Sequence, residues 1–270
     1  MPLRLTPTFR AALAASDRPL AGMWVCSGSA VATEIAAGSG LDWLLIDMEH
    51  SATSLETVLL QLQVAAAYPV APVVRVPGND PVTIKRVLDL GAQNLIVPMV
   101  SSADEARAAV AATRYPPAGV RGVGSALARS ARWNRVDDYL AAAADHVSLT
   151  VQIETAAGVA AAADIAAVEG VDAVFVGPSD LSASMGLLGQ QSHPDVVAAV
   201  HAVFAAAKDA GTPVGVNAFD PAVAEAYLDA GADFVAVGAD VALLARASEA
   251  LASRFVTARV ESDAPRRDSY

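Results

Sequence analysis

The chain has 270 residues, 54% of them hydrophobic, and a formal net charge of −11 at pH 7. This length suits one barrel-sized domain with a large core. The acidity argues against a nucleic-acid partner, which would need a basic face. No apolar run reaches the roughly 18 residues of a membrane span, and proline and charge interrupt the N-terminal residues too often for a signal peptide. The single cysteine, Cys26, excludes an internal disulfide and favours a reducing cytoplasm.

Eight short apolar runs recur along the chain with helical stretches between them. Each run is continuously hydrophobic, which is typical of parallel strands covered on both faces. This alternation predicts an α/β fold, a (β/α)8 TIM barrel, as one domain over residues 1–257, followed by a flexible tail over 258–270. The predicted strands are residues 20–25, 43–47, 73–76, 95–98, 149–154, 173–177, 213–217 and 234–238.

Helix signals separate the strands. Proline in a first turn and glycine just after a last turn mark starts and stops, and Ser54 is a suitable N-cap. The predicted helices cover residues 54–67, 81–90, 104–112, 194–210 and 221–230.

The segment 115–138 is a long connection rich in glycine, proline and arginine. Loops of this length on a barrel are usually functional or form interfaces. The arginines in and beside it have two interpretations. They form either an ordinary charged surface, or a positive lip that attracts an anionic substrate or contacts a neighbouring subunit. They are Arg114, Arg121, Arg129, Arg132 and Arg135.

Polar or ionisable residues stand where the predicted strands end. A (β/α)8 barrel keeps its active site at the carboxyl ends of its strands, so these side chains should meet. They predict an enzyme that holds a small anion against a metal ion. The residues are Trp24, Asp47, Arg75, Glu154, Asp180 and Asn217.

Glu154 and Asp180 follow successive strands and can share one ion. Carboxylate oxygens with water and substrate oxygens suit Mg²⁺ or Mn²⁺, and no Cys/His set has zinc spacing. Asp180 could instead cap a helix that starts at Leu181. The turn 177–181 also offers free N–H groups for a carboxylate or phosphate.

Arg75 and His50 complete the candidate chemistry. An arginine inside a buried strand needs an anion, which is either a structural ion-pair partner or a substrate oxygen. His50 follows the second strand and either moves a proton or is a solvated loop histidine. A Schiff-base mechanism is disfavoured because the only two lysines, Lys85 and Lys208, fall in the middle of predicted helices.

Several long motifs resemble the HpcH/HpaI aldolases over about residues 22–255. They include DWLLIDMEH at 42–50, RYPPAGVRGVGSALARSARWN at 114–134, VEGVDAVFVGPSDLSASMG at 168–186 and FVAVGADVALLARASEAL at 234–251. The resemblance implies a phosphoenolpyruvate/pyruvate-type barrel with a domain-swapped terminal helix, in a trimer-based hexamer. It also implies a metal-dependent class II aldolase of aromatic catabolism that reversibly cleaves 4-hydroxy-2-oxoacids into pyruvate and an aldehyde.

The resemblance also implies roles for single residues. Glu154 and Asp180 would ligate Mg²⁺, Mn²⁺ or Co²⁺, with Asp47 supporting the water shell of the metal. Arg75 would hold the keto oxygen and the enolate.

The same resemblance assigns the remaining contacts. His50 would transfer protons, partnered by Asp89. Gln152 would line the site, the N–H groups of Ser179 and its neighbour Asp180 would bind the pyruvate carboxylate, and Trp24 would line the aldehyde side.

Asn217 and Phe219 depart from the apolar stretch expected in that family. This difference predicts a smaller or more hydroxylated aldehyde, and hydroxypyruvate is conceivable as the donor. The alternatives are a lyase of the citrate-lyase β or malyl-CoA type, for which no basic patch for a CoA diphosphate is evident, and a non-catalytic barrel.

Overall fold

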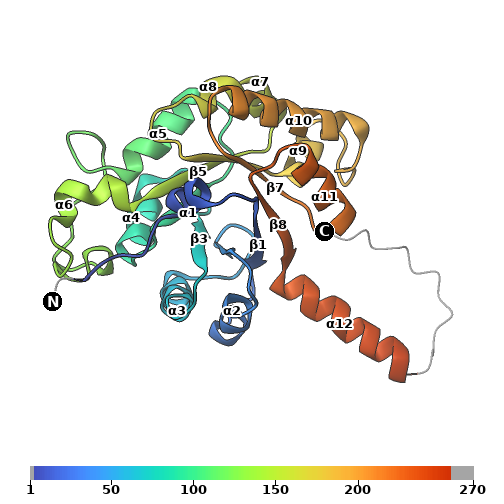
Figure 1. The fold of residues 1–270 in the computed structure, drawn as a ribbon, viewed down its shortest axis with the longest axis horizontal. Coiled ribbons are helices and arrows are strands. Elements are labelled where there is room, and N and C mark those ends of the chain that lie inside the picture. Colours follow the sequence, from blue (N-terminus) through green and yellow to red (C-terminus); the bar gives the residue numbers. More distant parts are fainter. Residues whose placement is uncertain (1–2, 257–270) are drawn as a thin grey trace.

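The computed structural model describes residues 3–256 and confirms the barrel (Figure 1). The strands pair in parallel in chain order, and β8 closes against β1. All eight predicted strands are present, with ends shifted by at most two residues. They are β1 (Leu20–Val25), β2 (Trp43–Asp47), β3 (Ala71–Arg75), β4 (Asn94–Val97), β5 (Ser148–Ile153), β6 (Ala173–Val176), β7 (Val214–Asn217) and β8 (Phe234–Ala239).

Helices lie around the barrel, and the five predicted ones are confirmed to within two residues at each end. Those five are α3 (Leu55–Ala65), α4 (Pro81–Asp89), α5 (Ala103–Thr113), α10 (Pro194–Asp209) and α11 (Pro221–Asp229). The structure also contains helices for which the sequence analysis gave no residue range. These are α1 (Phe9–Ala15), α2 (Ala30–Ala37), α6 (Tyr139–Ala142), α7 (Ala156–Ala160), α8 (Ala162–Ala166), α9 (Pro178–Ser184), α12 (Asp240–Phe255) and the 3₁₀ turns η1 (Arg129–Ala131) and η2 (Ala143–His146).

Aromatic side chains fill the barrel interior, and α1 closes the end of the barrel where the strands begin. Phe9 of α1 packs against the rings of Trp43 at 5.4 Å and Phe234 at 5.2 Å. Gly22 and Gly215 make room for these rings, since a Cβ at either position would collide with Trp43 or Phe234. Cutting such a ring back to alanine costs about 3–5 kcal/mol. The interior is therefore a packed core, and the strand ends above it are left for polar side chains.

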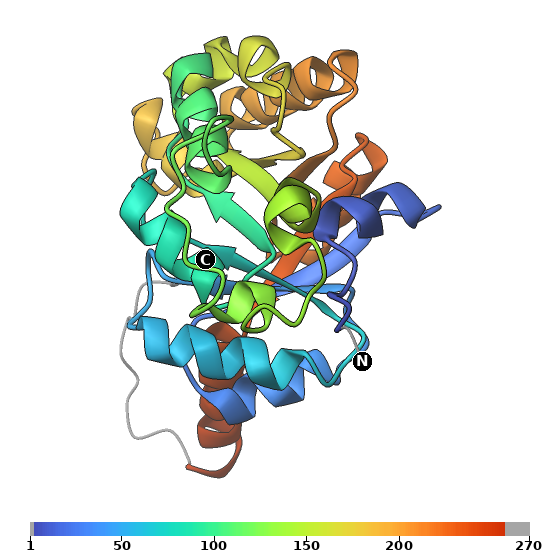
Figure 2. The same cartoon turned by 90° about the vertical axis from the view of Figure 1, so that its left-hand side faces the viewer.

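The segment 115–138 packs beside the carboxyl end of α4, and the N-terminal residues run along it (Figure 2). Arg121 is 1% exposed, pairs with Asp89 at 3.2 Å and stacks on the ring of Tyr115 at 4.6 Å. The charged-surface interpretation is therefore wrong for Arg121. The carboxyl end of α4 leads into the start of β4, so this ion pair lies toward the face of the barrel opposite the strand carboxyl ends.

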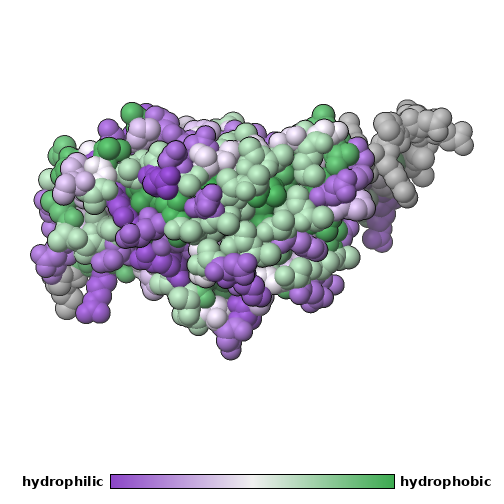
Figure 3. Space-filling model, turned by 90° about the horizontal axis from the view of Figure 1, so that it is seen from above, coloured by the Kyte–Doolittle hydropathy of each residue, from purple (hydrophilic) through white to green (hydrophobic). Residues whose placement is uncertain are grey.

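Helix α12 has no buried residue along its length, and it extends away from the barrel (Figure 1). Its start is fixed, because the Asp240 carboxylate accepts hydrogen bonds from the N–H groups of Cys26 and Ser27 at 2.8 and 3.1 Å. Beyond that point Leu244 and Phe255 are more than 70% exposed. Figure 3 shows the molecule from above the view of Figure 1. On this face hydrophilic and hydrophobic residues are mixed. Among residues 3–256, no helix combines the length and apolar character that crossing a bilayer requires.

The expected tail, residues 258–270, lies outside the described residues.

Candidate active site

Arg75 ends β3 and is held on three sides. Its Nε lies 2.8 Å from Oδ1 of Asp47, its Nη1 lies 2.7 Å from Oε2 of Glu49, and its guanidinium carbon stands 4.3 Å from the centre of the Trp24 ring. Arg75 is 4% exposed. A buried guanidinium fixed in this way is already oriented before any substrate arrives. The ion pair considered as an alternative does exist, yet Arg75 also lines a pocket of about 290 Å³ at the strand ends.

Asp47 organises the turn that follows β2. Its carboxylate is 1% exposed and accepts hydrogen bonds from the backbone N–H groups of Glu49 and His50, at 3.0 and 3.2 Å, in addition to the bond from Arg75. These bonds place Glu49 beside Arg75 and leave the His50 side chain 63% exposed. The contacts of Asp47 are those of a residue that positions Arg75 and this turn.

Glu154 follows β5 and is 1% exposed. One carboxylate oxygen accepts the Met99 N–H at 2.7 Å, and the other accepts a bond from the Gln152 amide. Met99 has a left-handed backbone, φ 58°, which is costly for a residue with a Cβ. A Cβ on Gly177 would lie 2.7 Å from Oε2 of Glu154, so only glycine fits there. The local backbone is therefore shaped around this carboxylate.

The charge around Glu154 is poorly compensated. Burial raises the pKa of Glu154 to about 7, and the nearby charges of Glu49 and Asp180 add to the rise, while the Met99 hydrogen bond opposes it. Burial also raises the pKa of Glu49; the Arg75 charge opposes that rise, and the charges of Asp47 and Asp180 add to it. The neighbouring carboxylates therefore disfavour the charged forms of Glu49 and Glu154.

Asp180 stands in the first turn of α9 and is exposed to the pocket. The helix begins at Pro178 rather than Leu181, and Gly177 is its N-cap. The predicted alternative that Asp180 caps this helix is therefore wrong.

A hard divalent cation fits this set of donors. Glu154 and Asp180 offer the carboxylate oxygens that Mg²⁺ and Mn²⁺ prefer, and the ion's other positions would go to water and substrate oxygens. The raised pKa of Glu154 marks a place where added positive charge is favourable. Within the described residues, no group of three His, Cys, Asp or Glu side chains is arranged as a ready ligand set. The third acid nearby, Glu49, is bound to Arg75.

The pocket collects most of the predicted site residues. Its wall also includes Cys26, whose thiol pKa burial raises to about 12, so this residue is no thiolate nucleophile. Trp24 donates its indole N–H to Oδ1 of Asn217 at 2.7 Å. The predicted residues that line it are Trp24, Asp47, His50, Arg75, Gln152, Ser179, Asp180 and Asn217.

Comparison with known proteins places the chain in a family. A family model described as HpcH/HpaI aldolase/citrate lyase matches residues 20–247. The chain belongs to the HpcH/HpaI aldolase/citrate lyase family. It is 54% identical to a Shigella sonnei protein named 4-hydroxy-2-oxo-heptane-1,7-dioate aldolase, over 92% of this chain and 94% of that protein. The chain is therefore an aldolase of this family, a carbon–carbon lyase.

Solved structures agree with this placement. A HpcH/HpaI family protein from Burkholderia cenocepacia J2315 matches the aldolase with a TM-score of 0.88 and 44% identity, over 92% of this chain and 99% of that one. A citrate synthase matches with a TM-score of 0.81 and 28% identity, over 92% of this chain and 97% of that one.

Two predicted site residues do not line the pocket: Glu154 lies just behind its wall, bonded to Gln152, whereas Asp89 lies far from it. Asp89 ends α4 on the opposite side of the barrel and pairs with Arg121. The acid nearest to His50 is instead Glu49, whose Oε2 lies 3.9 Å from Nε2 of His50. The predicted His50–Asp89 pair is therefore wrong within one chain, because the connection from α4 to β4 carries Asp89 away from the strand carboxyl ends.

Glu49 is the functional residue that sequence reasoning missed. It stands in the turn two positions after Asp47, and both acids contact Arg75. That spacing was available as a signal, but Glu49 lies beyond the apolar run that marked β2.

Proposed function

We propose that this aldolase is metal-dependent and reversibly cleaves 4-hydroxy-2-oxoacids into pyruvate and an aldehyde. The observation that carries the proposal is the buried, fixed Arg75 facing the same pocket as Asp180, with Glu154 close beneath. Cleavage of the C3–C4 bond leaves an electron pair on the pyruvate fragment as an enolate, and a site that holds positive charge there lowers the barrier.

The residues take distinct parts in this reaction. Arg75 donates hydrogen bonds to the oxygen on which negative charge develops, and a donor of this kind is worth about 3 kcal/mol in the transition state. The backbone N–H groups of Ser179 and Asp180 bind the oxoacid carboxylate. A divalent ion held by Glu154 and Asp180, whether Mg²⁺, Mn²⁺ or Co²⁺, supplies further positive charge when bound.

Proton transfer falls to His50. It accepts the proton of the 4-hydroxyl as the C3–C4 bond breaks and the hydroxyl carbon becomes the aldehyde carbonyl, and the enolate carbon then takes up a proton to give pyruvate. Its exposure at the pocket mouth allows exchange with water. Gln152 holds Glu154 in place through its amide.

Two features support assembly of several copies. The unburied α12 carries apolar side chains that a second copy would cover, as in a swapped terminal helix. The family resemblance pairs His50 with Asp89, and because these residues lie at opposite ends of the barrel, such a pair would require two chains. A trimer-based hexamer would satisfy both features.

The thioester-lyase alternative has weaker support. Arg75 is the only Lys or Arg that lines the pocket among the described residues, and it is already bound to two acids. A CoA diphosphate would therefore lack a cationic partner here.

The decisive experiment follows pyruvate release from a 4-hydroxy-2-oxoacid after EDTA treatment, and again after Mn²⁺ or Mg²⁺ is restored. EDTA should abolish turnover and the ions should restore it. Full turnover by the metal-free protein would show the mechanism to be wrong. Replacing pyruvate by hydroxypyruvate in the condensation direction tests the second donor.

A further inference from the structure

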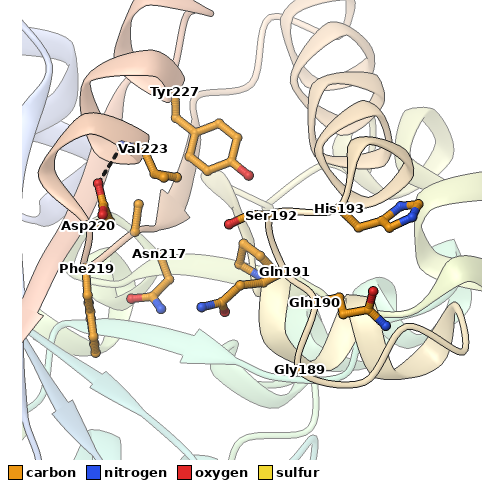
Figure 4. Close-up of a pocket in the computed structure, with 12 residues that line it drawn as sticks. Gly189, Gln190, Gln191, Ser192, His193, Asn217, Phe219, Asp220, Val223 and Tyr227 are labelled. Carbon is orange, nitrogen blue, oxygen red and sulfur yellow. Dashed lines mark hydrogen bonds between the residues drawn. The ribbon is translucent and has the colours of Figure 1, made fainter. Parts of the chain in front are cut away.

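A second pocket of about 410 Å³ opens beside the first (Figure 4). It lies between the loop 186–193, which follows α9, and the first turns of α11. The two pockets share Pro178, Asn217 and Phe219. The inference drawn from it rests on the proposed function, since the second pocket is where the aldehyde half of the substrate would extend.

Asn217 stands at the junction with its amide orientation fixed. An indole N–H is only a donor, so the atom that it meets at 2.7 Å must be the Asn217 carbonyl oxygen. The Asn217 NH₂ group is thereby turned away from Trp24, and Figure 4 shows the amide directed toward Gln191. Asn217 thus offers a donor to whatever crosses from the first pocket to the second.

Tyr227 forms the far wall and is fixed as firmly. Its ring packs edge-on against His201 at 6.0 Å and against Phe204 at 5.9 Å, and the residue is 3% exposed. Its hydroxyl makes no hydrogen bond to the other lining residues drawn in Figure 4. Burial raises the pKa of Tyr227, so the hydroxyl keeps its proton. A hydroxyl that lines a pocket and bonds none of the other lining residues is available to a ligand hydroxyl.

Gln191 lines the second pocket and contacts Ser179, which lines the first. Its Oε1 accepts a hydrogen bond from the Ser179 hydroxyl at 2.7 Å, which leaves its NH₂ group available to the pocket. The Ser192 hydroxyl adds a further neutral group on the same loop.

The pocket carries no fixed positive charge. Among the described residues that line it there is no Lys or Arg. Its acid, Asp220, caps α11 by accepting the N–H groups of Ala222 and Val223 at 2.8 and 3.2 Å, and Nδ1 of His193 accepts the Asp195 N–H. A terminal carboxylate would lose its hydration here without a partner and would face Asp220.

We propose that Asn217, Gln191 and Tyr227 form an acceptor subsite for the hydroxyl groups of a neutral hydroxyaldehyde. The subsite would select such aldehydes over those that end in a carboxylate. The relative named for a 1,7-dioate acts, by that name, on a substrate with a carboxylate at each end. The two proteins would therefore share the cleavage reaction and differ in the aldehyde.

The test measures condensation with pyruvate and Mn²⁺ for three four-carbon acceptors: erythrose, butanal and succinic semialdehyde. Wild-type protein should show its highest kcat/KM with erythrose. Tyr227→Phe removes one hydroxyl and keeps the packed ring, and it should raise KM for erythrose about tenfold while leaving butanal unchanged. Asn217→Leu should act in the same direction. Tyr139→Phe, at a buried tyrosine far from either pocket, is the matched control and should change nothing.

A higher kcat/KM with succinic semialdehyde than with erythrose would overturn the subsite, as would an equal effect of Tyr227→Phe on all three acceptors. Absence of product with every acceptor would instead overturn the proposed function itself. The two failures are therefore distinguishable.

Discussion

Replacing Glu154 by glutamine should stabilise the metal-free protein at neutral and alkaline pH. Burial and the neighbouring acids raise the pKa of Glu154 from 4.5 to about 7. An acid whose folded-state pKa exceeds its unfolded value binds more protons when folded, so stability falls as pH rises between the two values. The loss is complete above about pH 7 and amounts to about 3 kcal/mol.

The substitution suits the surrounding hydrogen bonds. The Met99 N–H can donate to the new amide oxygen as it does to the carboxylate. Gln152 Oε1 is buried without a partner among the described residues, so a turn of that amide offers an acceptor to the new NH₂ group. Metal-free Glu154→Gln should therefore match the wild type near pH 4.5 and exceed it by up to about 3 kcal/mol at pH 8.

The assay is chemical denaturation in EDTA at pH 5, 6, 7 and 8, at one fixed protein concentration because oligomers gain stability with concentration. Glu225→Gln, at an exposed glutamate, is the matched control and should leave the pH profile unchanged. Adding Mn²⁺ at pH 8 should stabilise the wild type and leave Glu154→Gln largely unaffected. A stability difference between Glu154→Gln and wild type that stays constant from pH 5 to 8 would refute the reasoning.

Three further predictions follow from the geometry. Arg75→Lys keeps the charge but cannot reproduce the forked contacts and the ring stack, so kcat/KM should fall about 100-fold with an unchanged far-UV CD spectrum; near-wild-type kcat/KM would contradict the assigned role. Leu244→Asp charges the apolar face of α12 and should shift the protein to a smaller species in gel filtration, whereas an unchanged elution volume would argue against a docked α12. Co-expressed His50→Asn and Asp89→Asn chains should regain activity that neither variant has alone, provided that the pair forms between copies.

The barrel could be predicted because each strand is a single apolar run between clear helix stops. Strand ends then located Trp24, Arg75 and Asn217, because parallel strands bring their carboxyl ends to one face. The sequence did not predict the left-handed Met99, whose N–H binds Glu154, because that contact depends on how β4 and β5 sit together. Asp89 was paired with His50 from the family resemblance alone, although the predicted helix over residues 81–90 already puts Asp89 at the end that leads into a strand start, opposite the strand carboxyl ends.

The charges at the strand ends favour the bound cation that we propose. Four carboxylates, those of Asp47, Glu49, Glu154 and Asp180, lie around one guanidinium, that of Arg75, at this pocket. An oxoacid would add a further negative charge to this excess of carboxylates. The raised pKa of Glu154 shows that burial and the neighbouring acids already disfavour its charged form. Arg75 cannot offset this excess alone, since two of the acids hold it in place. A dication held by Glu154 and Asp180 would supply positive charge beside the substrate oxygens, so substrate binding and metal binding would reinforce each other.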